Sequence, residues 1–170
     1  MKTCMFTGHR PQRLPFRFNE NDERCKILKQ RLNDLIREMI ENGIDVFVTG
    51  MAIGVDTYAA EEVLLLKKEF PHISLEAIVP CANQASKWNE KQVSRYNDLL
   101  KKCDKVVILQ DNYTADCMQK RNRYMVDRSD CVIAVWDGSG SGTGSTVRYA
   151  LEKKLSVTVI HPSSLSVREL

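Results

Sequence analysis

Short apolar segments alternate with longer amphipathic segments along the whole of this 170-residue chain. The apolar segments are rich in β-branched residues, which is typical of strands that are buried on both faces of a sheet. Strands are therefore expected at Lys2–Phe6, Ile44–Val48, Ile73–Val79, Lys105–Leu109, in the run that begins at Cys131, and at Ser156–Ile160.

The amphipathic segments carry apolar residues three or four positions apart, the spacing of a helix with one buried face. Helices are expected over about Asp22–Asn42, in a segment that includes Asp56 and Leu66, over Asn89–Lys102 and Ala115–Arg128, and onward from about Thr143. The tail, His161–Leu170, lacks such a pattern and is expected to be loosely ordered.

A regular succession of strand and helix predicts parallel strands joined by right-handed crossovers. We therefore expect one α/β domain over residues 1–170, with an open, doubly wound, mostly parallel sheet of about six strands flanked by helices. In such sheets ligands bind outside the carboxyl ends of the strands, where the strand order reverses. Residues that bind a ligand are therefore expected in the loops that leave the strands at that end.

The stretch from Cys131 to Thr146 has the clearest pattern of this kind. An apolar strand gives way to four glycines that alternate with small hydroxyl residues, and a helix resumes at about Thr143. The glycines are Gly138, Gly140, Gly142 and Gly144. Glycines let the backbone approach an anion closely, and the first amides of a helix have no acceptor of their own. The pattern favours a phosphate-binding loop over a flexible Gly/Ser surface loop.

A second loop, Thr7-Gly-His-Arg-Pro11, leaves the first strand. Gly8 permits a tight turn, and His9 and Arg10 can contact an anion or a ribose. The alternative is a turn histidine and a surface charge.

A third loop, Thr49–Asp56, contains Gly50 and Gly54 and leads from the second strand into a helix. Asp56 caps that helix, accepts hydrogen bonds from ligand hydroxyls or orders a neighbouring loop, and the sequence leaves these alternatives open. Because all three loops leave strands at the same edge, we expect them to face one crevice. Arg121, on the helix that precedes the strand at Cys131, is expected to reach the same crevice.

Composition narrows the function further. The net charge of +3 is compatible with a small anionic ligand and argues against bulk nucleic-acid binding. No apolar run is long enough to span a bilayer, and the N-terminus lacks a signal-peptide pattern, so a cytoplasmic protein that does not contact membranes is expected. The six cysteines form no Cys-x-x-Cys pair and no zinc-spaced cluster, so we expect reduced thiols and no metal.

The glycine spacing does not match the dinucleotide fingerprint Gly-x-Gly-x-x-Gly after the first strand, nor a P-loop, which needs Gly-Lys-Ser/Thr. An ordinary dehydrogenase or nucleoside triphosphatase is therefore disfavoured.

Three segments together carry a resemblance to a known family: Cys4-x-x-Thr-Gly-His-Arg-Pro11, Gly50-Met-Ala-Ile-Gly-Val-Asp56, and Arg121-Asn-Arg-Tyr-Met-Val-Asp-Arg-Ser-Asp130 followed by Ala134-Val-Trp-Asp-Gly138. They resemble the YpsA-like branch of the SLOG superfamily over nearly the whole chain. The resemblance implies a Rossmann-like fold and a nucleotide or nucleotide-derived ligand. The superfamily includes the Lonely guy phosphoribohydrolases and the DNA-processing protein DprA.

The phosphoribohydrolases carry a catalytic Arg in Met-His-x-Arg-Lys and a Glu in Pro-Gly-Gly-x-Gly-Thr-x-x-Glu. The first motif is similar to Met118-Gln-Lys-Arg-Asn122, which keeps the Arg as Arg121. The second is similar to Gly140-Ser-Gly-Thr-Gly-Ser-Thr146, with Thr146 in the position of the Glu. A threonine hydroxyl carries no negative charge at neutral pH, so the resemblance implies the ligand more strongly than the reaction.

The leading hypothesis is a binding protein, a sensor or regulator, for a nucleotide-derived ligand such as AMP, ADP-ribose or NAD. The expected ligand contacts are Thr7, Gly8, His9, Arg10, Gly50, Gly54, Asp56, Arg121, Asn122, Gly138, Gly140, Gly142, Thr143, Gly144 and Thr146. One alternative is an N-glycosidic hydrolase that uses Arg121 with Asp56 or Asp127, and another is a DprA-like binder of single-stranded nucleic acid. Whether the chain forms a homo-oligomer is left open.

Overall fold

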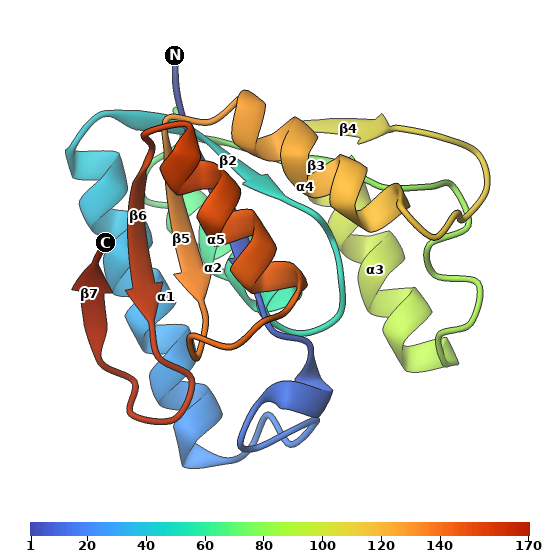
Figure 1. Cartoon of the computed structure of the whole chain (residues 1–170), viewed down its shortest axis with the longest axis horizontal. Coiled ribbons are helices and arrows are strands. Elements are labelled where there is room, and N and C mark those ends of the chain that lie inside the picture. Colours follow the sequence, from blue (N-terminus) through green and yellow to red (C-terminus); the bar gives the residue numbers. More distant parts are fainter.

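A seven-stranded sheet runs through the molecule in the order β4-β3-β2-β1-β5-β6-β7, in a computed structural model that describes residues Met1–Leu170 (Figure 1). The first six strands are parallel, and β7 is antiparallel to β6. The strands are β1 Lys2–Gly8, β2 Ile44–Thr49, β3 Ser74–Val79, β4 Lys105–Ile108, β5 Cys131–Val135, β6 Ser156–Ile160 and β7 Val167–Glu169.

Five α-helices and one short 3-10 helix connect these strands. They are η1 Pro11–Arg13, α1 Glu23–Glu41, α2 Val55–Lys67, α3 Glu90–Lys102, α4 Cys117–Asp127 and α5 Gly142–Glu152. Every predicted strand and helix is present, with ends that shift by one or two residues. The doubly wound α/β fold expected from the sequence is confirmed.

The helices form two layers, one on each face of the sheet (Figure 1). Alternate residues of each strand point to opposite faces, so Phe6 stacks on Phe47 at 5.9 Å in the core beneath α1, α2 and α3. Met5 points the other way and packs with Val132 under α4 and α5. Both faces of the sheet are therefore buried, which explains why the strand sequences are continuous apolar runs.

The order of the strands places a ligand crevice beside β1. The chain moves outward from β1 through β2 and β3 to β4, and then returns across the sheet to place β5 on the other side of β1. The connections that follow β1 and β5 therefore leave in opposite directions, toward α1 and α5, and open a crevice at the carboxyl ends of these strands.

The tail differs from the expectation. It forms β7, and the amide of Leu170 donates to the carbonyl of Val157 at 2.9 Å. Leu165 is buried in a left-handed conformation with φ 59°, and it turns the chain back along β6. The prediction of a loosely ordered tail is wrong because every residue of β7 is exposed, so the strand leaves no hydrophobic signature.

Gly8 ends β1 where α2 begins, and the two elements pack without room for a side chain. A Cβ atom at Gly8 would lie 2.5 Å from Cγ1 of Val55, whereas one at Gly140 would meet nothing within 4 Å. We expect Gly8→Ala to lower the free energy of unfolding by about 1–3 kcal/mol through overpacking. Urea unfolding measures this, with Gly140→Ala as the matched control. Equal stability of the two variants would contradict the close packing.

Candidate functional site

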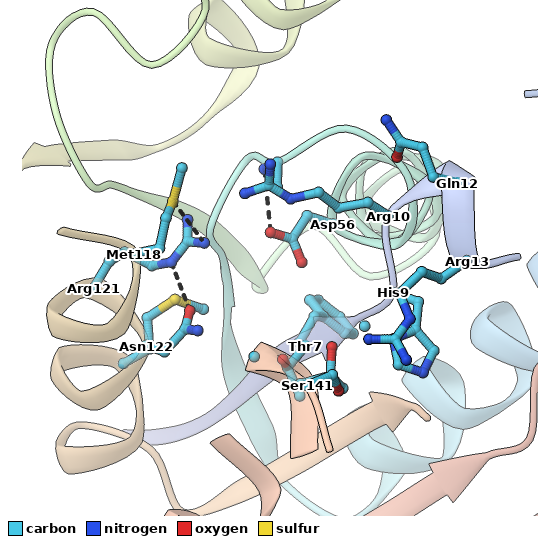
Figure 2. Close-up of a pocket in the computed structure, with 16 residues that line it drawn as sticks. Thr7, His9, Arg10, Gln12, Arg13, Asp56, Met118, Arg121, Asn122 and Ser141 are labelled. Carbon is cyan, nitrogen blue, oxygen red and sulfur yellow. Dashed lines mark hydrogen bonds between the residues drawn. The ribbon is translucent and has the colours of Figure 1, made fainter. Parts of the chain in front are cut away.

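A cavity of about 380 Å³ lies at the crevice beside β1, where three loops and one helix meet (Figure 2). Its lining comes from the end of β1 and the loop after it, from the start of α2, from α4 and from the start of α5. These residues are Phe6, Thr7, Gly8, His9, Arg10, Gln12, Arg13, Ala52, Asp56, Met118, Arg121, Asn122, Met125, Ser141, Gly142 and Thr143. In Figure 2, Arg121 and Asn122 lie on one side and His9 and Arg13 on the other.

Arg121 is a buried cation whose own contacts are all uncharged. Its Nη1 donates to the carbonyl oxygen of Gly50, its Nε donates to Oδ1 of Asn122 at 2.8 Å, and Nη2 lies 3.7 Å from the sulfur of Met118. Burial lowers the pKa of Arg121, and the nearby carboxylate of Asp56 opposes that shift. Arginine side chains stay protonated in proteins, so positive charge is held at the wall of the cavity.

Asp56 is the carboxylate that faces this cation across the cavity. Its Oδ2 accepts a hydrogen bond from the amide of Ala52 at 3.1 Å, which closes the turn before α2. Burial raises the pKa of Asp56, while Arg121, the Ala52 amide and Arg10 act to lower it. Asp56 therefore orders its own loop and also presents a carboxyl group to the cavity.

The turn between β2 and α2 is held in a strained form. Met51 adopts a left-handed conformation with φ 58°, which non-glycine residues rarely do. Thr49 secures it, because its Oγ1 accepts from the amide of Met51 at 3.2 Å and donates to the carbonyl of Asp56 at 3.0 Å. The turn therefore has one fixed shape, which keeps Asp56 in place.

His9 joins the first loop to the glycine-rich loop. Its Nε2 lies 3.0 Å from Oδ1 of Asp137, and the Asp137 amide lies 3.3 Å from the same nitrogen. Burial is the largest influence on His9 and lowers its pKa, although Asp137 acts in the opposite direction. Hydrogen bonds from Ser139 are the largest influence that holds the pKa of Asp137 below its usual range. The two loops are thus locked together at the rim of the cavity.

The start of α5 presents free amides to the cavity. The Ser141 side chain caps the helix by accepting from the amide of Gly144 at 3.1 Å, and the Ser145 amide donates to the carbonyl of Ser141. The amides of Gly142 and Thr143, which both line the cavity, have no acceptor within the protein. A helix start of this kind attracts anions through its amides and its dipole.

Gln12 and Arg13 line the cavity although sequence reasoning did not single them out. Pro11 begins the 3-10 helix η1, which turns the chain back so that Nη2 of Arg13 donates to the Ser139 hydroxyl at 2.9 Å. Residues three apart lie on the same side of a 3-10 turn. The spacing of Arg10 and Arg13 around Pro11 was therefore a signal that could have identified the second arginine.

Several predicted contacts lie outside this cavity and support it instead. Gly50 supplies the carbonyl that holds Arg121 and has no room for a side chain beside the guanidinium group. Gly54 has φ 95° and packs on Pro11, and Gly144 packs on Trp136. Gly138, with φ 87°, and Gly140 lie in open parts of the glycine-rich loop.

Two further candidates point away from the cavity. The Thr146 hydroxyl donates to the carbonyl of Gly142 at 2.9 Å, so it satisfies the backbone of its own helix. The Asp127 carboxylate accepts from the Tyr149 hydroxyl at 2.8 Å and lies 3.6 Å from Nζ of Lys153. Asp127 is therefore part of a surface contact between α4 and α5, away from Arg121 and Asp56.

Other kinds of site find little support. No three His, Cys, Asp or Glu side chains are grouped so that they could hold a metal ion, and all six cysteines are free thiols. None of the helices combines the length and the apolar character needed to cross a bilayer. The charged and titratable side chains that line the cavity are Arg10, Arg13, Arg121, His9 and Asp56.

His9 gives the site a measurable pH dependence. Burial lowers the pKa of His9 in the folded state, whereas in the unfolded state the pKa is about 6.5. Below about pH 6.5 the unfolded state therefore binds a proton that the folded state does not. The free energy of unfolding falls as the pH falls from about 6.5 to the lowered pKa of the folded state. We expect the free energy of unfolding to fall between pH 7 and 5, and His9→Gln to flatten that slope. Denaturant unfolding across this range checks it, with the exposed His72→Gln as control. An unchanged slope in His9→Gln would contradict the assignment.

Two relatives align with most of the chain. A UPF0398 protein of Halalkalibacterium halodurans is 31% identical over 154 residues, which cover 89% of this chain and 79% of that protein. The SPbeta prophage-derived protein YoqJ of Bacillus subtilis is 34% identical over 151 residues, which cover 79% of this chain and 88% of that protein.

Two solved structures have a similar fold. DNA processing protein A of Helicobacter pylori, described with its single-stranded DNA binding mode, matches with a TM-score of 0.64 and 22% identity. The match covers 93% of this chain and 64% of that one. DprA of Streptococcus pneumoniae matches with a TM-score of 0.64 and 19% identity, over 95% of this chain and 50% of that one. At these identities the likeness concerns the fold, and the chain spans only part of those proteins.

The family model agrees with the resemblance seen in the sequence motifs. The YspA SLOG family matches residues 4–165, which include all three loops of the cavity and both layers of helices. The chain therefore belongs to the YspA SLOG family.

Proposed function

We propose that this protein binds a nucleotide or nucleotide-derived ligand through its phosphate in the cavity beside β1, and acts as a sensor or regulator. The observation that carries the proposal is the charge of this cavity. Arg10, Arg13 and Arg121 line it, and Asp56 is its single carboxylate. Such an excess of positive charge in a concave site favours an anion.

Free hydrogen-bond donors support a phosphate as that anion. The unpaired amides of Gly142 and Thr143 face the same space as the arginines. A Cβ atom at Gly142 would meet nothing within 4 Å, so protein packing does not require glycine there, whereas close approach of a ligand does. Hydrogen bonds to a charged group contribute about 1.5–3 kcal/mol each, so a few of them give micromolar affinity.

The size and the remaining side chains suit a nucleotide. A volume of about 380 Å³ lies within the range of small-molecule sites. Asp56 and the free Nδ2 group of Asn122 offer one acceptor and one donor for sugar hydroxyls or base edges. Hydrogen bonds to these two groups are possible for a nucleotide, which has a sugar and a base, and the site would therefore bind a nucleotide more tightly than free phosphate.

Arg10 provides the first test of this proposal, because it is exposed and its side chain makes no hydrogen bond or ion pair in the structure. We expect Arg10→Ala to weaken AMP binding about tenfold or more, with an unchanged melting temperature. Isothermal titration calorimetry measures the affinity, and Arg168→Ala removes an equal charge from the exposed strand β7 as control. The proposal fails if AMP, ADP-ribose and NAD all fail to bind, or if both variants bind like the wild type.

A second candidate function, hydrolysis of an N-glycosidic bond, is favoured by one observation. Asp56 is a buried carboxyl group with a raised pKa beside Arg121, as a general acid or base requires. Against it, the position of the catalytic Glu in the phosphoribohydrolases is taken here by Thr146, whose hydroxyl is bonded to Gly142.

Incubation with AMP, ADP-ribose and NAD separates binding from hydrolysis. We expect binding without release of base or ribose, measured by liquid chromatography, since the cavity has no second carboxylate to act with Asp56. Release of base that Asp56→Asn abolishes would establish the hydrolase instead. Binding of a single-stranded oligonucleotide is measured in the same way at about 50 mM salt. Tight binding that weakens as salt is added would favour a DprA-like role.

A further inference from the structure

A second cavity, of about 420 Å³, lies between α4 and α5, which pack side by side on one face of the sheet (Figure 1). It adjoins the first cavity, because Met118, Asn122 and Gly142 line both. The two cavities therefore meet at these three residues, one of which, Gly142, carries a free amide.

The second cavity is also built for an anionic or polar group. Arg123 and Arg148 line it, and Glu152 is its single carboxylate. Arg148 is exposed and its side chain makes no hydrogen bond or ion pair, and neither does the hydroxyl of Ser145. The positive charge of Arg148 and the hydrogen-bond donors of both side chains are therefore available to a ligand.

A fixed aromatic ring forms part of the same wall. The hydroxyl of Tyr149 donates to Asp127 at 2.8 Å, and the Arg123 guanidinium lies over the ring, 5.3 Å from its centroid. Nζ of Lys153 also lies over this ring, 5.3 Å from its centroid. The ring and its two cations form a charged aromatic surface, of the kind against which a sugar or a base can lie. The ring is oriented without any ligand, so it costs little to order on binding.

We propose that the two cavities form one extended site for a ligand with two sugar-bearing halves joined by a pyrophosphate, the class of the nucleoside diphosphate sugars and dinucleotides. This rests on the proposed function of the first cavity. The linking phosphates lie at the amides of Gly142 and Thr143, where the cavities meet, and the second half lies against Arg148 and the Arg123–Tyr149 pair. A mononucleotide fills one cavity and leaves the second without a ligand.

The test compares AMP with ADP-ribose by isothermal titration calorimetry on the full chain. We expect the wild type to bind ADP-ribose about tenfold or more tightly than AMP, because Arg148 and its neighbours add hydrogen bonds to the second half. Arg148→Ala removes most of that advantage and leaves AMP binding within about twofold. Arg168→Ala, on the exposed strand β7, is the charge-matched control and changes neither affinity.

A second variant tests the space itself. Ser145 is exposed, lines only the second cavity and makes no side-chain hydrogen bond, so we expect Ser145→Trp to fill that cavity and leave the first unchanged. We expect this variant to bind AMP normally and to lose the preference for ADP-ribose.

The outcomes separate this inference from the proposal on which it rests. If AMP binds and ADP-ribose binds no more tightly, or if Arg148→Ala weakens both equally, the extended site is wrong while the phosphate site stands. If neither of these nucleotides nor NAD binds, both proposals are wrong. A single-stranded oligonucleotide that binds more tightly than ADP-ribose and depends on Arg148 would assign the second cavity to nucleic acid and overturn the inference.

Discussion

The structure around the cavity depends on one buried charge. Removing a guanidinium group from water is costly unless its donors are satisfied, and Arg121 meets that requirement with the Gly50 carbonyl, Asn122 and Met118. None of these partners is charged, so the positive charge is held in position without being neutralised by direct contact. Asp56 lies near enough to moderate the charge through space. Gly50 supplies the carbonyl that holds the guanidinium, and the left-handed turn at Met51 leads to the start of α2, where Asp56 lies.

The loops around this charge are connected to one another rather than attached separately to the sheet. His9 contacts Asp137, and Arg13 reaches the Ser139 hydroxyl, so the first loop and the glycine-rich loop restrain each other. Trp136 adds a further restraint, because its Nε1 donates to the carbonyl of Ser139 at 2.9 Å. A loop rich in glycine would have high conformational entropy if it were free, and these contacts reduce it before any ligand arrives. The glycine-rich segment is therefore an ordered start to α5 rather than a flexible linker.

The sequence predicted the sheet and the convergence of the loops because both depend on regular signals: apolar runs, helical spacing and the rule that ligands lie at the carboxyl ends of parallel strands. It could not predict β7, whose residues are exposed, or the separate roles of the glycines, which depend on distant neighbours such as Arg121 beside Gly50. Thr146 and Asp127 looked equivalent to the other candidates in the sequence, yet one bonds to its own helix and the other to Tyr149. Side-chain direction within a helix decides such cases, and spacing alone does not reveal it.

The arrangement of charges also bears on what the site does with a ligand. A hydrolase of N-glycosidic bonds needs a carboxylate near the bond that breaks, in addition to groups that hold the phosphate. Here the groups that suit a phosphate are three arginines and two free amides, whereas Asp56 is the single carboxyl group of the cavity and its Oδ2 accepts from the Ala52 amide. Because interactions that stabilise a bound ligand and a transition state equally do not accelerate the chemical step, a site built mainly from such contacts favours retention of the ligand. The residues that line this cavity come from the starts of α2 and α5 and from α4, so an anion bound there would contact three helices.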